Sequence, residues 1–139
     1  LDYNYLIESK NVNTDVYNNR GLILLKLNKY NEALADLTKA LTLNPQNSNA
    51  YFNRGLAYYN LGDYKKAVEE YTLAMQYNPN YAYAYSNRAD AYAALKQYNN
   101  ALKDATTAKQ MGATVNEGFI EMLKRNTHWN LNEQKKTNY

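Results

Sequence analysis

Apolar and small residues recur along this chain at helical spacing, not at the alternating spacing of a strand. From Tyr51 they fall at positions i, i+4 and i+7, with Arg54 at i+3 on the same face, and a second run from Tyr64 follows helical spacing as well. Such spacing puts these residues on one face of an amphipathic helix. Between the two runs lies the polar pair Gly62-Asp63, which suits a tight turn. The pattern therefore predicts two antiparallel helices, at about 48–61 and 64–77.

The same pattern recurs along the chain with a strict period. The dipeptide Asn-Arg occurs three times, 34 residues apart, each time with Tyr three residues before the Arg and with Gly or Ala directly after it: Asn19-Arg20, Asn53-Arg54 and Asn87-Arg88. A fixed period of this length indicates stacked copies of one small unit. We therefore divide the chain into three frames, 14–47, 48–81 and 82–115.

These frames resemble the tetratricopeptide repeat (TPR) family. In that family a large aromatic residue is followed four residues later by a small one, and the second helix carries alanines before a proline. The middle frame fits this pattern at Tyr51, Gly55, Tyr58, Ala67, Tyr71, Ala74 and Pro79. The third frame departs from it at Ala89 and at Gly112-Ala113, but Ala is also small, and Gly112 can end a helix in the left-handed conformation. The resemblance implies an all-α fold, a right-handed superhelical array of antiparallel helix pairs.

The two ends of the chain need separate interpretations. Residues 1–13 echo the second helix of a repeat, and we interpret them as a remnant helix or an N-terminal cap. Because the chain begins with Leu and not with Met, we expect that it was processed or cut from a longer sequence. At the other end, residues 116–127 carry Phe119, Met122 and Leu123 on one helical face. This suits a capping helix, because the last unit of a repeat array needs a polar outer side. We expect a polar, frayed tail at 128–139.

Composition excludes several classes of function. The formal net charge is only +3 and no basic block is present, so nucleic-acid binding has little electrostatic support. No stretch approaches 18 apolar residues, which predicts a soluble protein without membrane insertion, in a compartment that the sequence leaves undecided. The chain has no cysteine, so disulfides and thiolate metal sites are excluded.

Catalytic chemistry also finds little support. His128 is the single histidine and it lies in the expected tail. The glycines are scattered and form no phosphate-binding loop, and no serine has a histidine within the same frame. We expect no enzymatic activity, no cofactor and no metal site.

What remains is a binding surface on the first helices of the frames. In the TPR family these helices line a concave groove in which partner peptides or helices dock. The resemblance places ten residues of this chain in that groove: Asn19, Leu22, Asn49, Phe52, Asn53, Leu56, Tyr59, Tyr83, Asn87 and Asp90. The three repeated asparagines would form a ladder, because a carboxamide can both donate to and accept from a peptide backbone. The alternative is that they only solvate the groove or cap local backbone.

One specialised TPR function can be tested residue by residue. Repeats that bind the acidic C-terminal tails of chaperones carry a carboxylate clamp, formed by Lys and Asn, then Asn, then Lys and Arg, on three successive first helices. The matching positions here hold Asn18 and Leu22, then Asn53, then Tyr83 and Asn87. Only Asn53 fits, and the cations that would pair with carboxylates are missing. We therefore expect no chaperone-tail binding of that kind.

The repeated arginines suggest a different role. Each is followed 16 residues later by an acid: Arg20 by Asp36, Arg54 by Glu70 and Arg88 by Asp104. In a helical hairpin this separation puts one residue on each helix, which predicts a half-buried ion pair within each repeat or to its neighbour. The alternative is that the arginines reach a ligand.

Together these observations predict a non-catalytic protein-interaction module that binds a segment of a partner protein in its groove. A second hypothesis is an architectural module that forms homo-oligomers through its repeat ends. A third is a regulatory piece of a larger enzyme.

Overall fold

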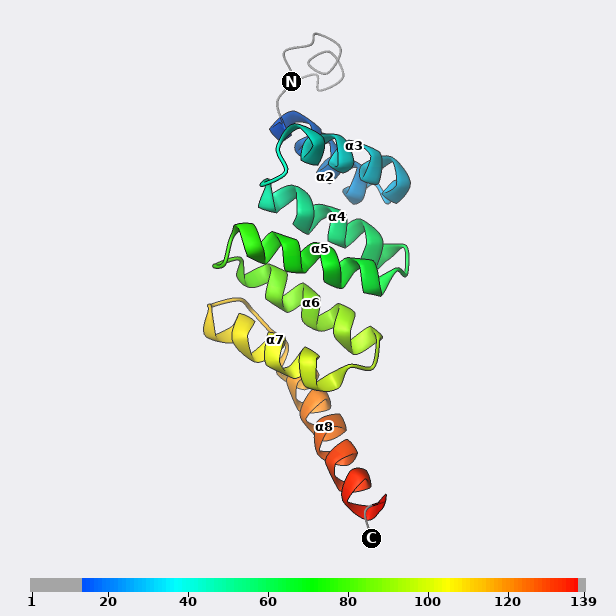
Figure 1. Cartoon of the computed structure of the whole chain (residues 1–139), viewed down its shortest axis with the longest axis vertical. Coiled ribbons are helices and arrows are strands. Elements are labelled where there is room, and N and C mark those ends of the chain that lie inside the picture. Colours follow the sequence, from blue (N-terminus) through cyan, green and yellow to red (C-terminus); the bar gives the residue numbers. More distant parts are fainter. Residues whose placement is uncertain (1–13, 138–139) are drawn as a thin grey trace. The chain divides into compact units, whose positions relative to one another are not determined.

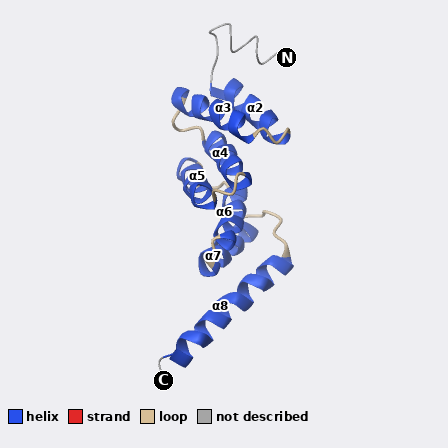
Figure 2. Cartoon of the chain, turned by 90° about the vertical axis from the view of Figure 1, so that its right-hand side faces the viewer, coloured by secondary structure: helices blue, strands red, loops and turns tan. Residues whose placement is uncertain are grey.

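The computed structural model describes residues 14–137, and side chains up to residue 127. Every element in this range is an α-helix (Figure 2). The helices are α2 (Thr14–Lys26), α3 (Tyr30–Leu43), α4 (Ser48–Asn60), α5 (Tyr64–Tyr77), α6 (Ala82–Ala94), α7 (Tyr98–Gln110) and α8 (Glu117–Thr137). The all-α prediction is confirmed, and α4 and α5 begin where the periodicity predicts. The expected helix in residues 1–13 lies outside the described residues.

The chain divides into two compact units, which we describe separately. The first, through Pro79, holds the helix pairs α2/α3 and α4/α5, and α3 also packs on α4 (Figure 1). The second, from Asn80, holds the pair α6/α7 and the helix α8, which packs on α7. Each pair is a helical hairpin closed by a short turn.

The turns within the pairs share one backbone geometry. Asn28, Gly62 and Lys96 occupy equivalent positions and have φ angles of 60°, 82° and 60°, in the left-handed region. In the second pair the amide of Gly62 donates to the carbonyl of Tyr59 at 3.0 Å, and that of Asp63 to the carbonyl of Tyr58 at 2.9 Å. This is the Schellman motif, which satisfies the last carbonyls of a helix while the chain reverses. Gly112, with φ of 98°, ends α7 in the same way, as the sequence predicts.

Small residues let the two helices of each hairpin approach closely. A Cβ atom added to Gly21 would lie 2.8 Å from the Leu37 side chain, and one added to Gly55 would lie 2.6 Å from the ring of Tyr71. Both distances are shorter than real Cβ contacts. The first helix therefore has room for the side chain of the second only because the side chain of residue 21 or 55 is missing.

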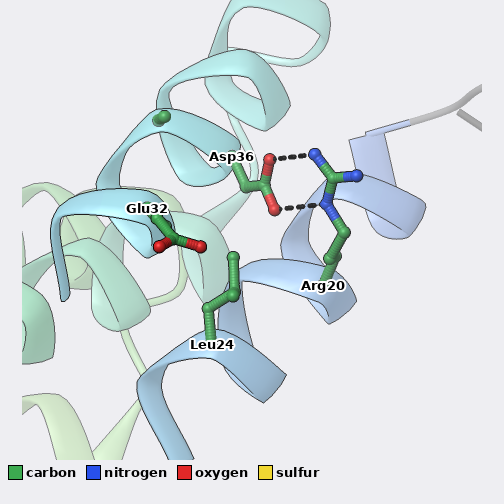
Figure 3. Close-up of a pocket in the computed structure, with 5 residues that line it drawn as sticks. Arg20, Leu24, Glu32 and Asp36 are labelled. Carbon is green, nitrogen blue, oxygen red and sulfur yellow. Dashed lines mark hydrogen bonds and ion pairs between the residues drawn. The ribbon is translucent and has the colours of Figure 1, made fainter. Parts of the chain in front are cut away.

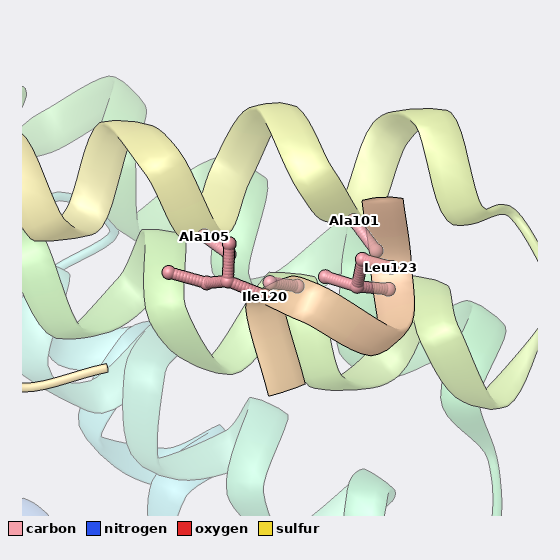
Figure 4. Close-up of a cluster of buried hydrophobic side chains, with 5 residues drawn as sticks. Ala101, Ala105, Ile120 and Leu123 are labelled. Atoms are coloured by element: carbon pink, nitrogen blue, oxygen red, sulfur yellow. The ribbon is translucent and has the colours of Figure 1, made fainter. Parts of the chain in front are cut away.

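The last helix completes the core of the second unit. Ile120 and Leu123 of α8 pack with Ala101 and Ala105 of α7 in one buried cluster (Figure 4). Phe119 and Met122 pack against the edge of this cluster. The helix is longer than predicted, because it continues to Thr137 and not to residue 127. Residues 128–137, most of which are polar, extend this helix.

The shared turn geometry leads to a paired prediction. Lys96→Gly removes the cost of a left-handed side-chain-bearing residue and should raise the free energy of unfolding by about 1 kcal/mol. Gly62→Ala introduces that cost and should lower the free energy of unfolding by a similar amount. No steric clash adds to this cost, because a Cβ at Gly62 would meet no atom within 4 Å. Urea denaturation followed by circular dichroism measures both changes. Equal stability of the three proteins would show that the turns tolerate either residue.

Candidate functional site

The repeated arginines form the predicted ion pairs, one in each repeat. Each guanidinium donates two parallel hydrogen bonds to one carboxylate. The Nε and Nη2 distances are 2.6 and 2.6 Å for Arg20–Asp36, 2.7 and 3.0 Å for Arg54–Glu70, and 2.6 and 2.8 Å for Arg88–Asp104. Bidentate pairs of this kind are the strongest and most directional that side chains form.

The carboxylates of Asp36 and Asp104 favour the charged forms of Arg20 and Arg88. The hydrogen bond to Asp36 raises the pKa of Arg20 above its ordinary value. Burial lowers the pKa of Arg88, but the hydrogen bond to Asp104 and the charge of that carboxylate outweigh burial, so the pKa is raised. Three of the chain's cations are therefore used inside the repeats.

The first helices of the first unit present a row of half-buried apolar side chains. Leu22 and Leu56 pack against the buried cluster around Leu37. The ring of Phe52 lies 5.7 Å from that of Tyr71, and the ring of Tyr59 lies 5.1 Å from that of Tyr64, centroid to centroid. These contacts fix the orientation of the row, and each of its four members stays partly exposed.

The prediction that the three repeated asparagines form an open ladder is wrong at Asn53. Asn53 is only 6% exposed, and its Nδ2 donates to Oδ1 of Asn18 at 2.9 Å. It therefore joins α4 to α2 and is not presented to a ligand as an open carboxamide. Asn18, itself 8% exposed, is the hydrogen-bond partner of Asn53 that the periodicity did not reveal. The equivalent positions hold Phe52 and Ser86, so this contact occurs outside the repeated pattern.

The other predicted polar residues are more accessible. Asn19 on α2 and Asn49 on α4 are exposed. In the second unit, α6 carries Tyr83, which is 58% exposed, together with exposed Asp90 and half-buried Asn87. Seven of the ten predicted groove residues lie on α2 and α4 of the first unit, and α6 carries the remaining three.

Among the described residues no three His, Cys, Asp or Glu side chains gather as metal ligands would. None of the described helices is both long and apolar enough to cross a bilayer.

Comparisons with known proteins agree with the geometry. A family model described as "TPR repeat" matches residues 21–62, and one described as "Tetratricopeptide repeat" matches residues 48–81. A comparison with curated protein sequences finds no significant match.

Several solved structures are similar to this chain. The first TPR domain of Spaghetti (RPAP3), bound to the HSP90 peptide SRMEEVD, is 29% identical with a TM-score of 0.74, over 83% of this chain and 90% of that one. The first TPR domain of human RPAP3 is 27% identical with a TM-score of 0.78, over 86% and 95%. The TPR domain of Arabidopsis OM64 is 25% identical with a TM-score of 0.77, over 81% and 94%.

The ion pairs predict that replacing one partner lowers the free energy of unfolding more than replacing both. Arg54→Met leaves the carboxylate of Glu70, whose side chain is 11% exposed, without its two strongest donors. We expect a loss of about 2 kcal/mol in the free energy of unfolding, measured by urea denaturation. The double variant Arg54→Met, Glu70→Leu should recover most of this loss, because no unpaired charge remains buried. An Arg54→Met protein as stable as the wild type would contradict a structural role for the pair.

Proposed function

Because the chain belongs to the tetratricopeptide repeat family, we propose that it is a non-catalytic interaction module that binds a segment of a partner protein on the face formed by α2 and α4. The similar structures support this proposal, since the first TPR domain of Spaghetti carries a bound peptide. The family's fold serves protein interaction, and the residues of this face supply contacts suited to a peptide.

The observation that carries the proposal is the composition of the α2–α4 face. Leu22, Phe52, Leu56 and Tyr59 form its half-buried apolar row, and Asn19 and Asn49 are exposed on the same two helices. A few anchor residues, often aromatic, supply most of the free energy of an interface. Carboxamides contribute hydrogen bonds to a peptide backbone without selecting its side chains. The buried Asn18–Asn53 bond holds the two helices in register beneath this face.

The charge of this face argues against an acidic partner. Of the carboxylate-clamp positions, those in the first unit hold Asn18, Leu22 and Asn53, and none of these is a cation. Asn18 and Asn53 are moreover buried and bonded to each other. An uncharged or apolar segment fits the face better than an acidic C-terminus. The α6 residues Tyr83, Asn87 and Asp90 stay a sequence prediction as part of the same site.

Selection of peptides tests the face directly. We expect a phage-displayed library of random dodecapeptides, panned on the whole chain, to yield peptides that bind in solution. Asn19→Ala combined with Asn49→Ala should weaken these peptides roughly tenfold, since two hydrogen bonds contribute about 1.4 kcal/mol. Isothermal titration calorimetry measures the change. The matched control is Asn31→Ala combined with Asn99→Ala, two exposed asparagines on α3 and α7. Equal losses in both variants would place the peptides elsewhere.

The missing cations give a separate prediction. The peptide SRMEEVD should bind this chain no more tightly than a dissociation constant of about 1 mM, because no charge-assisted hydrogen bonds compensate for its carboxylates. The first TPR domain of Spaghetti is the positive control in the same calorimeter. Micromolar binding of SRMEEVD to this chain would overturn the argument from the clamp.

A further inference from the structure

A pocket opens between α2 and α3, away from the predicted groove residues. It has a volume of about 460 Å³ and is lined by Arg20, Leu24, Glu32, Ala35 and Asp36 (Figure 3). This volume lies within the range of about 300–1,000 Å³ that is typical of ligand sites. None of the five residues belongs to the α2–α4 face, so this pocket is a second site, independent of the proposed function.

A departure from the repeat pattern explains the pocket. The residues equivalent to Leu24 are Tyr58 and Tyr92. In the second repeat the ammonium of Lys66 lies 5.2 Å from the centroid of the Tyr58 ring. In the third repeat the guanidinium of Arg88 lies 5.5 Å from the centroid of the Tyr92 ring. Both repeats thus place an aromatic ring against a cation at this position, where the first repeat has only the smaller, aliphatic Leu24.

The charges around the pocket are also distinctive. Arg20 and Asp36 neutralise each other through their bidentate pair. Glu32 stands where the second repeat has Lys66, and it is exposed. The pocket therefore carries a net negative charge, which favours a cationic group over an anionic one. The Arg20 side chain is 30% exposed, against 19% for Arg54 in the same unit, so its guanidinium can be reached from the pocket.

We propose that this pocket binds an aromatic side chain of a partner protein that has a lysine or arginine beside it in sequence. The ring packs on Leu24 and lies against the guanidinium of Arg20, as the rings of the other repeats lie against their cations. The neighbouring cation pairs with the carboxylate of Glu32. The partner thereby supplies the ring that the first repeat lacks.

Titration of the isotope-labelled whole chain with short peptides tests the proposal. The probe is acetyl-Lys-Tyr-Lys-amide, followed by amide chemical shifts in ¹H–¹⁵N spectra. We expect saturable shifts at residues 20–24 and 32–36 in the millimolar range. Acetyl-Lys-Leu-Lys-amide, which lacks the ring, and acetyl-Glu-Tyr-Glu-amide, which reverses the charge, should each bind at least threefold more weakly. Equal binding of the leucine peptide would overturn the proposal, because charge alone would then explain the shifts.

Variants of the chain separate this pocket from other surfaces. Leu24→Tyr restores the residue of the other two repeats and should abolish the shifts. Leu43→Tyr is the matched control, because Leu43 lies on α3 outside the pocket and is 47% exposed, and it should leave binding unchanged. Glu32→Gln, an exposed and conservative change, should weaken binding at least threefold and keeps the test decisive if Leu24→Tyr fails to fold. Full binding by either pocket variant, or no shifts in the wild type, would overturn the proposal.

Discussion

The close approach of the two helices in each hairpin is the constraint on which the rest of the structure depends. Gly21 admits the side chain of Leu37, and Gly55 admits the ring of Tyr71, at distances that leave no room for a Cβ atom. Because the helices cross this closely, Arg54 on one helix can donate two hydrogen bonds directly to Glu70 on the other. A larger residue at the crossing would separate the helices and stretch the ion pair as well as the turn.

The third repeat meets the same constraint with different residues. Ala89 replaces the glycine, and Ala105 stands where the other repeats have Leu37 and Tyr71. The larger residue on one helix is thus matched by a smaller one on the other. Ala105 alone would leave the core of this hairpin thin, and Ile120 and Leu123 of α8 pack against it. The final helix therefore supplies core volume that the second helix of this repeat does not.

The ion pairs also shape what the surface can bind. Each repeated arginine forms an ion pair with an acid of its own hairpin, so its charge contributes little to the binding of an acidic partner. The α2–α4 face is built from leucines, aromatic rings and carboxamides. Where the first repeat replaces a tyrosine with Leu24, the ring is missing and a pocket opens beside Arg20. Both proposed sites follow from the repeat pattern. The α2–α4 face uses its regular positions, and the pocket at Leu24 arises where the pattern is interrupted.

The sequence by itself determined the features that depend on local order. Helix period, turn residues and the 16-residue interval between arginine and acid all lie within one hairpin, and they predicted α4, α5 and the three ion pairs.

Only the tertiary structure decided the contacts between hairpins. The hydrogen bond from Asn53 to Asn18 joins α4 to α2, and both side chains are buried. The carboxamide of Asn53, which we expected in the groove, therefore connects two helices. Asn18 has no counterpart at the equivalent positions, and periodicity cannot reveal a contact that occurs once. The pocket at Leu24 has the same origin. The sequence shows a break in the repeat there, because Leu24 replaces the tyrosine of the other two repeats. Whether neighbouring side chains fill the space of the missing ring depends on how α2 and α3 pack.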